Sequence, residues 1–139
     1  MRSREGPGQL VEPSERGAVA VEFAILLPVL VMLLMGIIEF GRAYNAQISL
    51  THAARESVRV MAISNNPVTA RNTAVNAAVS LRPALRTTDV DITTTNATSP
   101  GLCAAGARAT VTITYSLSTM TGIAGPFSLT ARGVMQCGG

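Results

Sequence analysis

The sequence has very few of the residues that build catalytic and nucleic-acid-binding sites. Among its 139 residues there is one histidine, no tryptophan and no lysine, and only 14% of the residues are charged. The eleven basic residues are all arginines and stand singly, without a basic stripe or interleaved aromatic residues, which excludes the usual nucleic-acid-binding surface. One histidine, with no G-x-S-x-G or S-x-x-K motif and no paired carboxylates, makes no catalytic site, so we expect no enzyme. His52 and Glu56 offer two ligands where a structural metal needs about four, so we expect no metal and no cofactor.

One long apolar run predicts a membrane span. From Ala18 to Ile38 the only charged residue is Glu22. In a helix this run rises about 31 Å, which matches the hydrocarbon thickness of a bilayer. A secretory signal peptide has a shorter apolar core of about 7–15 residues, followed by a small-residue cleavage site. Residues 39–46 contain no such site, so we predict a retained transmembrane segment at residues 18–40.

The span divides the chain into three predicted segments. Residues 1–17 are rich in glycine, proline, serine and charge, which is typical of a disordered leader. Residues 41–139 are long enough for one small domain. Arginines flank the span almost equally, so their count alone leaves the orientation open. Arg16 directly before the span, and two cysteines that both follow it, favour the N-terminus inside and an extracytoplasmic domain.

The hydrophobic period of residues 41–139 changes from helical to strand-like along the chain. From Gly41 to about Ile63 apolar residues recur at spacings of three and four, which continues the membrane helix. These residues are Ala43, Ala46, Leu50, Ala54, Val58 and Met61. After a break at residues 64–67, an alanine-rich stretch predicts a second helix from Val68 to Leu81.

Three later stretches alternate apolar and polar residues, as half-buried strands do. Their apolar residues are Val90 and Ile92; Ala109, Val111, Ile113, Tyr115 and Leu117; and Phe127, Leu129, Ala131, Gly133 and Met135. Strands with one apolar face each are best packed as an antiparallel sheet on a helix. We therefore predict an α+β fold with a long membrane-spanning helix, a second short helix and a small three-stranded antiparallel sheet.

The two cysteines are placed where a disulfide would close the sheet. Cys103 precedes the second predicted strand and Cys137 follows the third. If these strands are antiparallel neighbours, the start of one lies beside the end of the other. A disulfide there would stabilise the domain by about 3–4 kcal/mol in the chain-entropy model. The alternative is two unpaired thiols.

Two features near the domain have more than one interpretation. Glu39 closes the apolar run and Arg42 follows three residues later, which favours an ion pair on the helix surface over a subunit contact. The segment Ser118–Pro126 is apolar for an exposed loop. It is either a partner surface or a segment packed against the sheet.

The residues around Glu22 carry a resemblance to a known family. Arg16-Gly17 is followed by four small or apolar residues and then Glu22-Phe23. Leu27-Pro28 and the boundary sequence of residues 36–42, GIIEFGR, come later. The first pattern resembles the processing site of a type IV prepilin. Together, from residue 16 to about residue 63, they resemble the TadE-like pseudopilins of the Flp (Tad) pilus system, while the later part agrees only in its general, pilin-like layout.

The resemblance implies a processing site and a contact between subunits. A prepilin-class membrane aspartyl peptidase, TadV in that system, would cut between Gly17 and Ala18. Glu22, with Phe23 beside it, would then occupy the fifth mature position. In type IV pilins the glutamate at that position is thought to meet the N-terminal amine of a neighbouring subunit. The alternative for Glu22 is an ordinary signal anchor whose carboxylate reaches the membrane interface.

The resemblance also implies a function and a location. The chain would be a minor pseudopilin in the cytoplasmic (inner) membrane, with a structural role in pilus biogenesis and surface adhesion. Its partners would be the membrane, the prepilin peptidase, other Tad pseudopilins, the major pilin and the inner-membrane assembly platform. The alternative function is a single-pass membrane-anchored binding protein with no pilus role.

Overall fold

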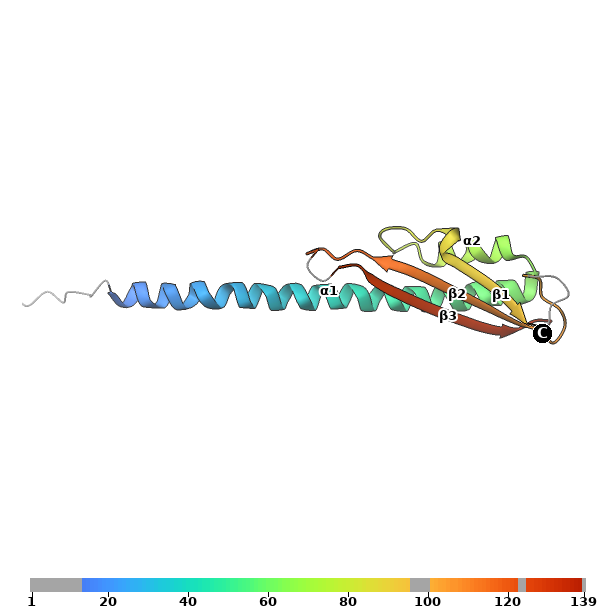
Figure 1. Ribbon diagram of the computed structural model, residues 1–139, viewed down its shortest axis with the longest axis horizontal. Helices are drawn as coiled ribbons and strands as arrows, with labels where there is room; N and C mark the ends of the chain where they lie inside the picture. Colours follow the sequence, from blue (N-terminus) through green and yellow to red (C-terminus); the bar gives the residue numbers. More distant parts are fainter. Residues whose placement is uncertain (1–13, 96–100, 123–124, 139) are drawn as a thin grey trace, which may run out of the picture. The chain divides into compact units, whose positions relative to one another are not determined.

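The computed structural model describes residues 14–95, 101–122 and 125–138 (Figure 1). Its elements are α1 Ser14–Ser64, α2 Pro67–Ala77, a short 3-10 helix η1 Thr87–Asp89, and strands β1 Val90–Thr95, β2 Arg108–Leu117 and β3 Phe127–Gln136. The chain forms two compact units, of which the first ends at Ile37 and the second begins at Ile38. The fold is α+β with a long apolar helix, a short helix and a three-stranded antiparallel sheet, as predicted.

Helix α1 begins at Ser14, four residues before its predicted start. The leader was expected to be disordered up to Gly17, so this expectation is wrong for residues 14–17; residues 1–13 lie outside the described part. Gly17 does not stop the helix, because one glycine inside a helix costs only about 1 kcal/mol relative to alanine.

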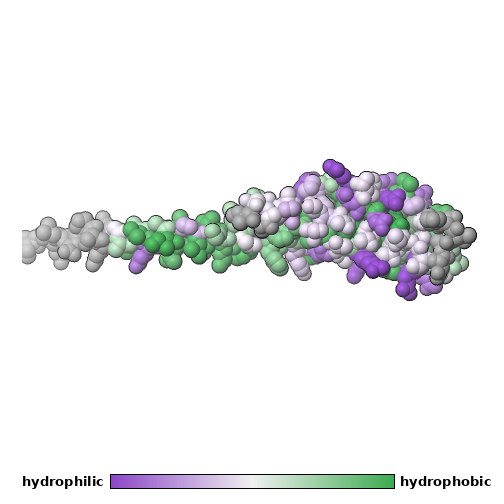
Figure 2. Space-filling model, in the orientation of Figure 1, coloured by the Kyte–Doolittle hydropathy of each residue, from purple (hydrophilic) through white to green (hydrophobic). Residues whose placement is uncertain are grey.

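In the first unit, α1 is apolar and exposed. Every side chain from Ala18 to Ile37 is exposed, and Figure 2 shows this segment with a largely hydrophobic surface. Among the described residues, α1 is the one helix long and apolar enough to cross a membrane, and the mean hydropathy of its most apolar window is 2.7. Apolar side chains that no protein atom covers are what a lipid-exposed helix requires.

The sheet of the second unit has strand order β1-β2-β3, and both neighbouring pairs are antiparallel. The long central strand β2 pairs Ile113 with Val90 of β1 and Val111 with Gly133 of β3. This register places the predicted apolar residues of all three strands on one face of the sheet.

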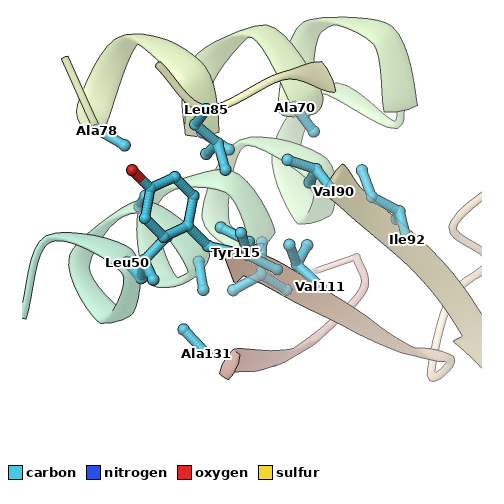
Figure 3. Close-up of a cluster of buried hydrophobic side chains, with 14 of the residues drawn as sticks. Leu50, Ala70, Ala78, Leu85, Val90, Ile92, Val111, Tyr115 and Ala131 are labelled. Atoms are coloured by element: carbon cyan, nitrogen blue, oxygen red, sulfur yellow. The ribbon is translucent and has the colours of Figure 1, made fainter. Parts of the chain in front are cut away.

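The core lies between that face of the sheet and the two helices. All the apolar residues predicted to face inward from β1 and β2 are buried. On α1 the predicted face is confirmed, with Ala43 partly buried and the rest buried. Figure 3 shows Leu50 of α1, Tyr115 and Val111 of β2 and Ala131 of β3 in one cluster.

The prediction for β3 is wrong at the ends of the strand. Ala131 and Gly133 are buried, but Phe127 is 37% exposed and Met135 is 41% exposed. As an edge strand, β3 pairs only with β2, and α1 contacts it at Thr130 and at Gly133, near the middle of the strand. Alternation therefore identified the inward face of β3 but not how much of that face is covered.

Gly133 is the point at which β3 and α1 approach most closely among the described glycines. A Cβ atom added to it would lie 2.5 Å from the Ala54 carbonyl oxygen and 3.1 Å from Val58 Cγ1. Gln47 Nε2 also donates a hydrogen bond to the Thr130 carbonyl at 3.0 Å. Small residues on both elements thus let a strand backbone rest directly on a helix backbone.

Two asparagines make the turn from α1 into α2. Asn65 adopts φ +49°, a left-handed conformation that asparagine tolerates better than most residues. Asn66 caps α2, since its Oδ1 accepts hydrogen bonds from the backbone N–H groups of Val68 and Thr69. Ser57 Oγ, buried in α1, donates to the Ala70 carbonyl at 2.8 Å and ties the two helices together.

Helix α2 ends at Ala77, four residues before the predicted end at Leu81. The Ala78 N–H bonds the carbonyls of Ala74 and Val75, and the chain then turns. The turn brings Leu81 into the core, where it is buried. Burial of Leu81 in the tertiary structure therefore overrides the helical preference of this stretch.

Tyr115 holds the segment after α2 against the sheet. Its hydroxyl donates a hydrogen bond to the Pro83 carbonyl at 2.7 Å. Burial raises the pKa of Tyr115 above its ordinary value, and the Arg42 and Arg82 guanidinium groups act against this rise. The folded protein therefore favours the protonated hydroxyl that makes this hydrogen bond.

Candidate functional site

The predicted processing site lies in the first turn of α1. The Gly17–Ala18 peptide bond comes three residues after the helix begins at Ser14. The first four N–H groups of a helix have no partner within it, so this turn is the easiest to open. Gly17 weakens it further, because glycine loses the most backbone freedom in a helix. A peptidase that needs an extended segment would meet little resistance here.

Glu22 lies one helical turn beyond Ala18, in the apolar segment. Its side chain is exposed, and the neighbouring Phe23 is 63% exposed. Within the described part of the chain, the Glu22 carboxylate has no hydrogen-bond or ion-pair partner. Both side chains are therefore available to a molecule outside this chain. Their roles in processing and subunit pairing stay predictions.

Glu39 and Arg42 form the ion pair that was predicted at the end of the apolar run. Arg42 Nη1 lies 3.2 Å from Glu39 Oε2, and the Arg42 side chain is 33% exposed. The Glu39 side chain is 12% exposed, so the pair is partly buried, and as an i,i+3 pair on one helix it contributes about 0.5 kcal/mol. The predicted alternative, a subunit contact at these residues, stays untested.

The other carboxylate oxygen of Glu39 has a partner that the sequence did not reveal. Glu39 Oε1 accepts a hydrogen bond from the backbone N–H of Met120 at 2.7 Å. Met120 lies 81 residues further along the chain, in the segment between β2 and β3. No local pattern relates the two, because their approach depends on how the sheet lies on α1.

A disulfide joins Cys103 to Cys137, the pairing predicted from the strand order. Their Cα atoms are 5.4 Å apart, and the bridge spans 34 residues. The Cys137 N–H donates to the Ala107 carbonyl at 2.8 Å, next to the last β2–β3 pair. The bridge therefore closes the open end of the β2–β3 hairpin.

Asn65 is a further residue of the disulfide region that sequence reasoning missed. Its Nδ2 donates to the Cys103 carbonyl at 3.1 Å, and its Oδ1 accepts from the Cys103 N–H. One side-chain amide thus pairs with both backbone groups of Cys103, as a neighbouring strand would. The sequence indicated only a turn at this asparagine.

A groove of about 380 Å³, with a mixed polar and apolar lining, is present between α1 and the segment that follows α2. It is lined by Arg42, Asn45, Ala46, Ser49, Ser80, Leu81, Arg82 and Leu117. Ser49 and Ser80 share a hydrogen bond of 3.2 Å across it. These residues include no nucleophile paired with a general base. Among the described residues there is also no group of three or more His, Cys, Asp or Glu that could hold a metal ion.

Comparison with known proteins gives one family. No curated protein and no solved structure matches the chain. The family model described as TadE-like protein matches residues 17–59. The matched range begins at Gly17 and contains Glu22, Phe23, Glu39 and Arg42. Residues 17–59 are therefore similar to the TadE-like protein family, which confirms the resemblance drawn from the sequence.

Proposed function

We propose that this chain is a minor pseudopilin of the Tad (Flp) pilus system, processed by a prepilin peptidase between Gly17 and Ala18. The observation that carries the proposal is the family match, which begins at Gly17. A cut between Gly17 and Ala18 would leave Glu22 as the fifth residue of the mature chain. The protein is single-pass in the cytoplasmic membrane, with its C-terminal domain outside. Its role in pilus biogenesis and adhesion is structural, not enzymatic. Its partners are the peptidase, sibling pseudopilins, the major pilin and the assembly platform.

The charge of Glu22 supports the subunit-pairing part of the proposal. A carboxylate at the bilayer centre costs about 3 kcal/mol, and the cost is smaller one turn from the end of a span. Cleavage creates a positive amine at Ala18, at the helix end where the macrodipole disfavours positive charge. An amine of one subunit and Glu22 of the next would satisfy both groups, and a desolvated pair of this kind helps to set helix register.

The course of α1 supports cleavage after Gly17 over cleavage by signal peptidase near residues 44–47. Helix α1 continues without a break through those residues. Ala46 is 5% exposed and belongs to the same core as Leu50. A cut there would divide an element on which the sheet packs. A cut after Gly17 leaves the whole core intact.

Mass spectrometry of the protein extracted from membranes of its host tests the processing step. The proposal expects an N-terminus at Ala18. A chain that retains residues 1–17 would contradict processing. It would favour the alternative function, a membrane-anchored binding protein with no pilus role. A chain that begins near residues 44–47 and is recovered without detergent would contradict the membrane span itself.

Replacement of Glu22 tests the pairing separately from processing. Glu22→Ala should still be cleaved at Ala18, whereas pili recovered by shearing should be lost or strongly reduced. Val21→Ala is the matched control, since it truncates the neighbouring exposed side chain without removing a charge, and piliation should persist. Normal piliation by Glu22→Ala would show that the pairing idea is wrong, even if cleavage at Ala18 stands.

A further inference from the structure

The described residues between β2 and β3, which are 118–122, 125 and 126, are uncharged and expose the apolar side chain of Met120. Residues 123 and 124 of this segment lie outside the described part. No charged residue occurs between Arg108 and Arg132. Met120 is 70% exposed, and Phe127, the first residue of β3, is 37% exposed. The sequence left open whether this segment packs against the sheet. The exposure of Met120 excludes such packing for that side chain.

Two hydrogen bonds set where this segment lies along α1. Gln47 Nε2 bonds the Thr130 carbonyl within β3, and Glu39 Oε1 bonds the Met120 N–H. Along the helix Glu39 precedes Gln47 by about 12 Å. The start of the β2–β3 connection, around Met120, therefore lies toward the N-terminal end of the part of α1 in the second unit, and Figure 1 shows β2 ending toward that side.

That end of the helix is where the apolar run stops. Glu39 directly follows Ile38, the last residue of the run. A residue held to the Glu39 side chain at 2.7 Å is thus held at the level at which the helix leaves the hydrocarbon. Lipid headgroups occupy this level, and amphipathic surfaces with exposed apolar side chains insert at it.

We propose that residues 118–122, at the start of the β2–β3 connection, make a second membrane contact, in which Met120 enters the boundary between headgroups and acyl chains. The occupant is lipid rather than another protein, because the bond to Glu39 fixes the level of Met120 whichever subunits are nearby. Arg42, which shares the Glu39 carboxylate, is 33% exposed and carries the charge that lipid phosphates attract. The inference rests on the proposed anchoring of α1 in a membrane, but not on the pilus role.

The absence of tryptophan makes the test direct, because one introduced tryptophan is the only one in the chain. Met120→Trp is compared with Val31→Trp, within the apolar run, and with Ile63→Trp, near the far end of α1. Ile63 is 73% exposed, close to the 70% of Met120, and lies about 36 Å along the helix from Glu39. Each full-length variant is reconstituted in vesicles of phosphatidylethanolamine and phosphatidylglycerol, with and without brominated acyl chains. Circular dichroism verifies that each variant is folded.

Brominated lipid should quench Met120→Trp and Val31→Trp strongly and Ile63→Trp little. Bromines near the headgroup end of the acyl chain should quench Met120→Trp more than bromines near the bilayer centre. If Val31→Trp is quenched and Met120→Trp behaves like Ile63→Trp, the membrane contact is wrong while the anchoring stands. If the fluorescence emission of Met120→Trp is blue-shifted but not quenched, the tryptophan is buried in protein, which also contradicts the membrane contact. If Val31→Trp is unquenched, the anchoring fails and the contact fails with it.

Discussion

The contact between Gly133 and α1 makes a sharp prediction about stability. Gly133→Ala adds a single methyl group at the centre of the fold. The added Cβ would lie 2.5 Å from the oxygen and 2.8 Å from the carbon of the Ala54 carbonyl. Both are backbone atoms, so no side-chain rotation can relieve the overlap. Helix α1 or strand β3 must move.

The size of the effect follows from the room that the methyl group needs. Ordinary contact begins at 3.4 Å, so the strand and helix must separate by about 0.9 Å, a gap that forfeits up to about half of each neighbouring contact. Overpacking of this kind costs about 3 kcal/mol at the upper end of its range. Alanine restricts the unfolded chain more than glycine does, which offsets about 1 kcal/mol. We expect a net loss of about 2 kcal/mol, or a fall in Tm of about 8–16 °C for a domain of this size.

Thermal unfolding of the full chain in detergent, followed by circular dichroism under oxidising conditions, measures this loss. Gly41→Ala is the matched control, because nothing lies within 4 Å of its added Cβ and it is in the helix of the same unit. That control should gain up to about 1 kcal/mol from the higher helix propensity of alanine. If Gly133→Ala is as stable as wild type or more stable, the close packing of β3 on α1 is wrong.

Three further predictions concern contacts of the second unit. Because the pKa of Tyr115 is raised, its hydroxyl stays protonated to a higher pH in the folded protein than in the unfolded chain. This difference contributes to the free energy of unfolding below about pH 10, and the contribution is lost as the pH rises through the pKa of the folded state. In urea unfolding between about pH 8 and about pH 11, Tyr115→Phe should lose stability less steeply than wild type, and equal slopes would contradict the assignment. Replacing Cys103 and Cys137 by serine should lower the free energy of unfolding by about 4 kcal/mol for a bridge of 34 residues, with an unchanged urea midpoint as the opposing result. Asn66→Ala should cost about 1 kcal/mol because α2 loses its N-cap, while Asn66→Asp should keep most of that stability; equal losses in both would argue against the cap.

Patterns within single segments were predictable because they depend on neighbours in the chain. The apolar run of α1 and the turn at Asn65 and Asn66 follow from composition and local backbone preferences. The inward faces of β1 and β2 follow from period-two alternation along each strand. The disulfide between Cys103 and Cys137 required one more assumption, that consecutive strands pair, and that assumption holds here.

The ends of elements were less predictable, because several backbone courses there satisfy local preferences almost equally. Helix α1 extends past Gly17 at its start, and α2 stops short of Leu81. At Leu81 the core decides the outcome, because burial of a leucine side chain outweighs a few residues of weak helix propensity. At Gly17 a single glycine is simply too small a penalty to end a helix.

The sequence by itself determined a membrane-length helix, an α+β domain and the Gly17–Glu22 spacing that resembles prepilins. Each of these features depends on the composition, periodicity or spacing of residues that are near one another in the chain. The tertiary structure alone decided that Gly133 must lack a side chain, that Asn65 holds Cys103, and that Glu39 holds Met120. Each of those contacts joins residues far apart in the chain. Their distances are set by the packing of the sheet on α1, and local periodicity carries no information about that packing.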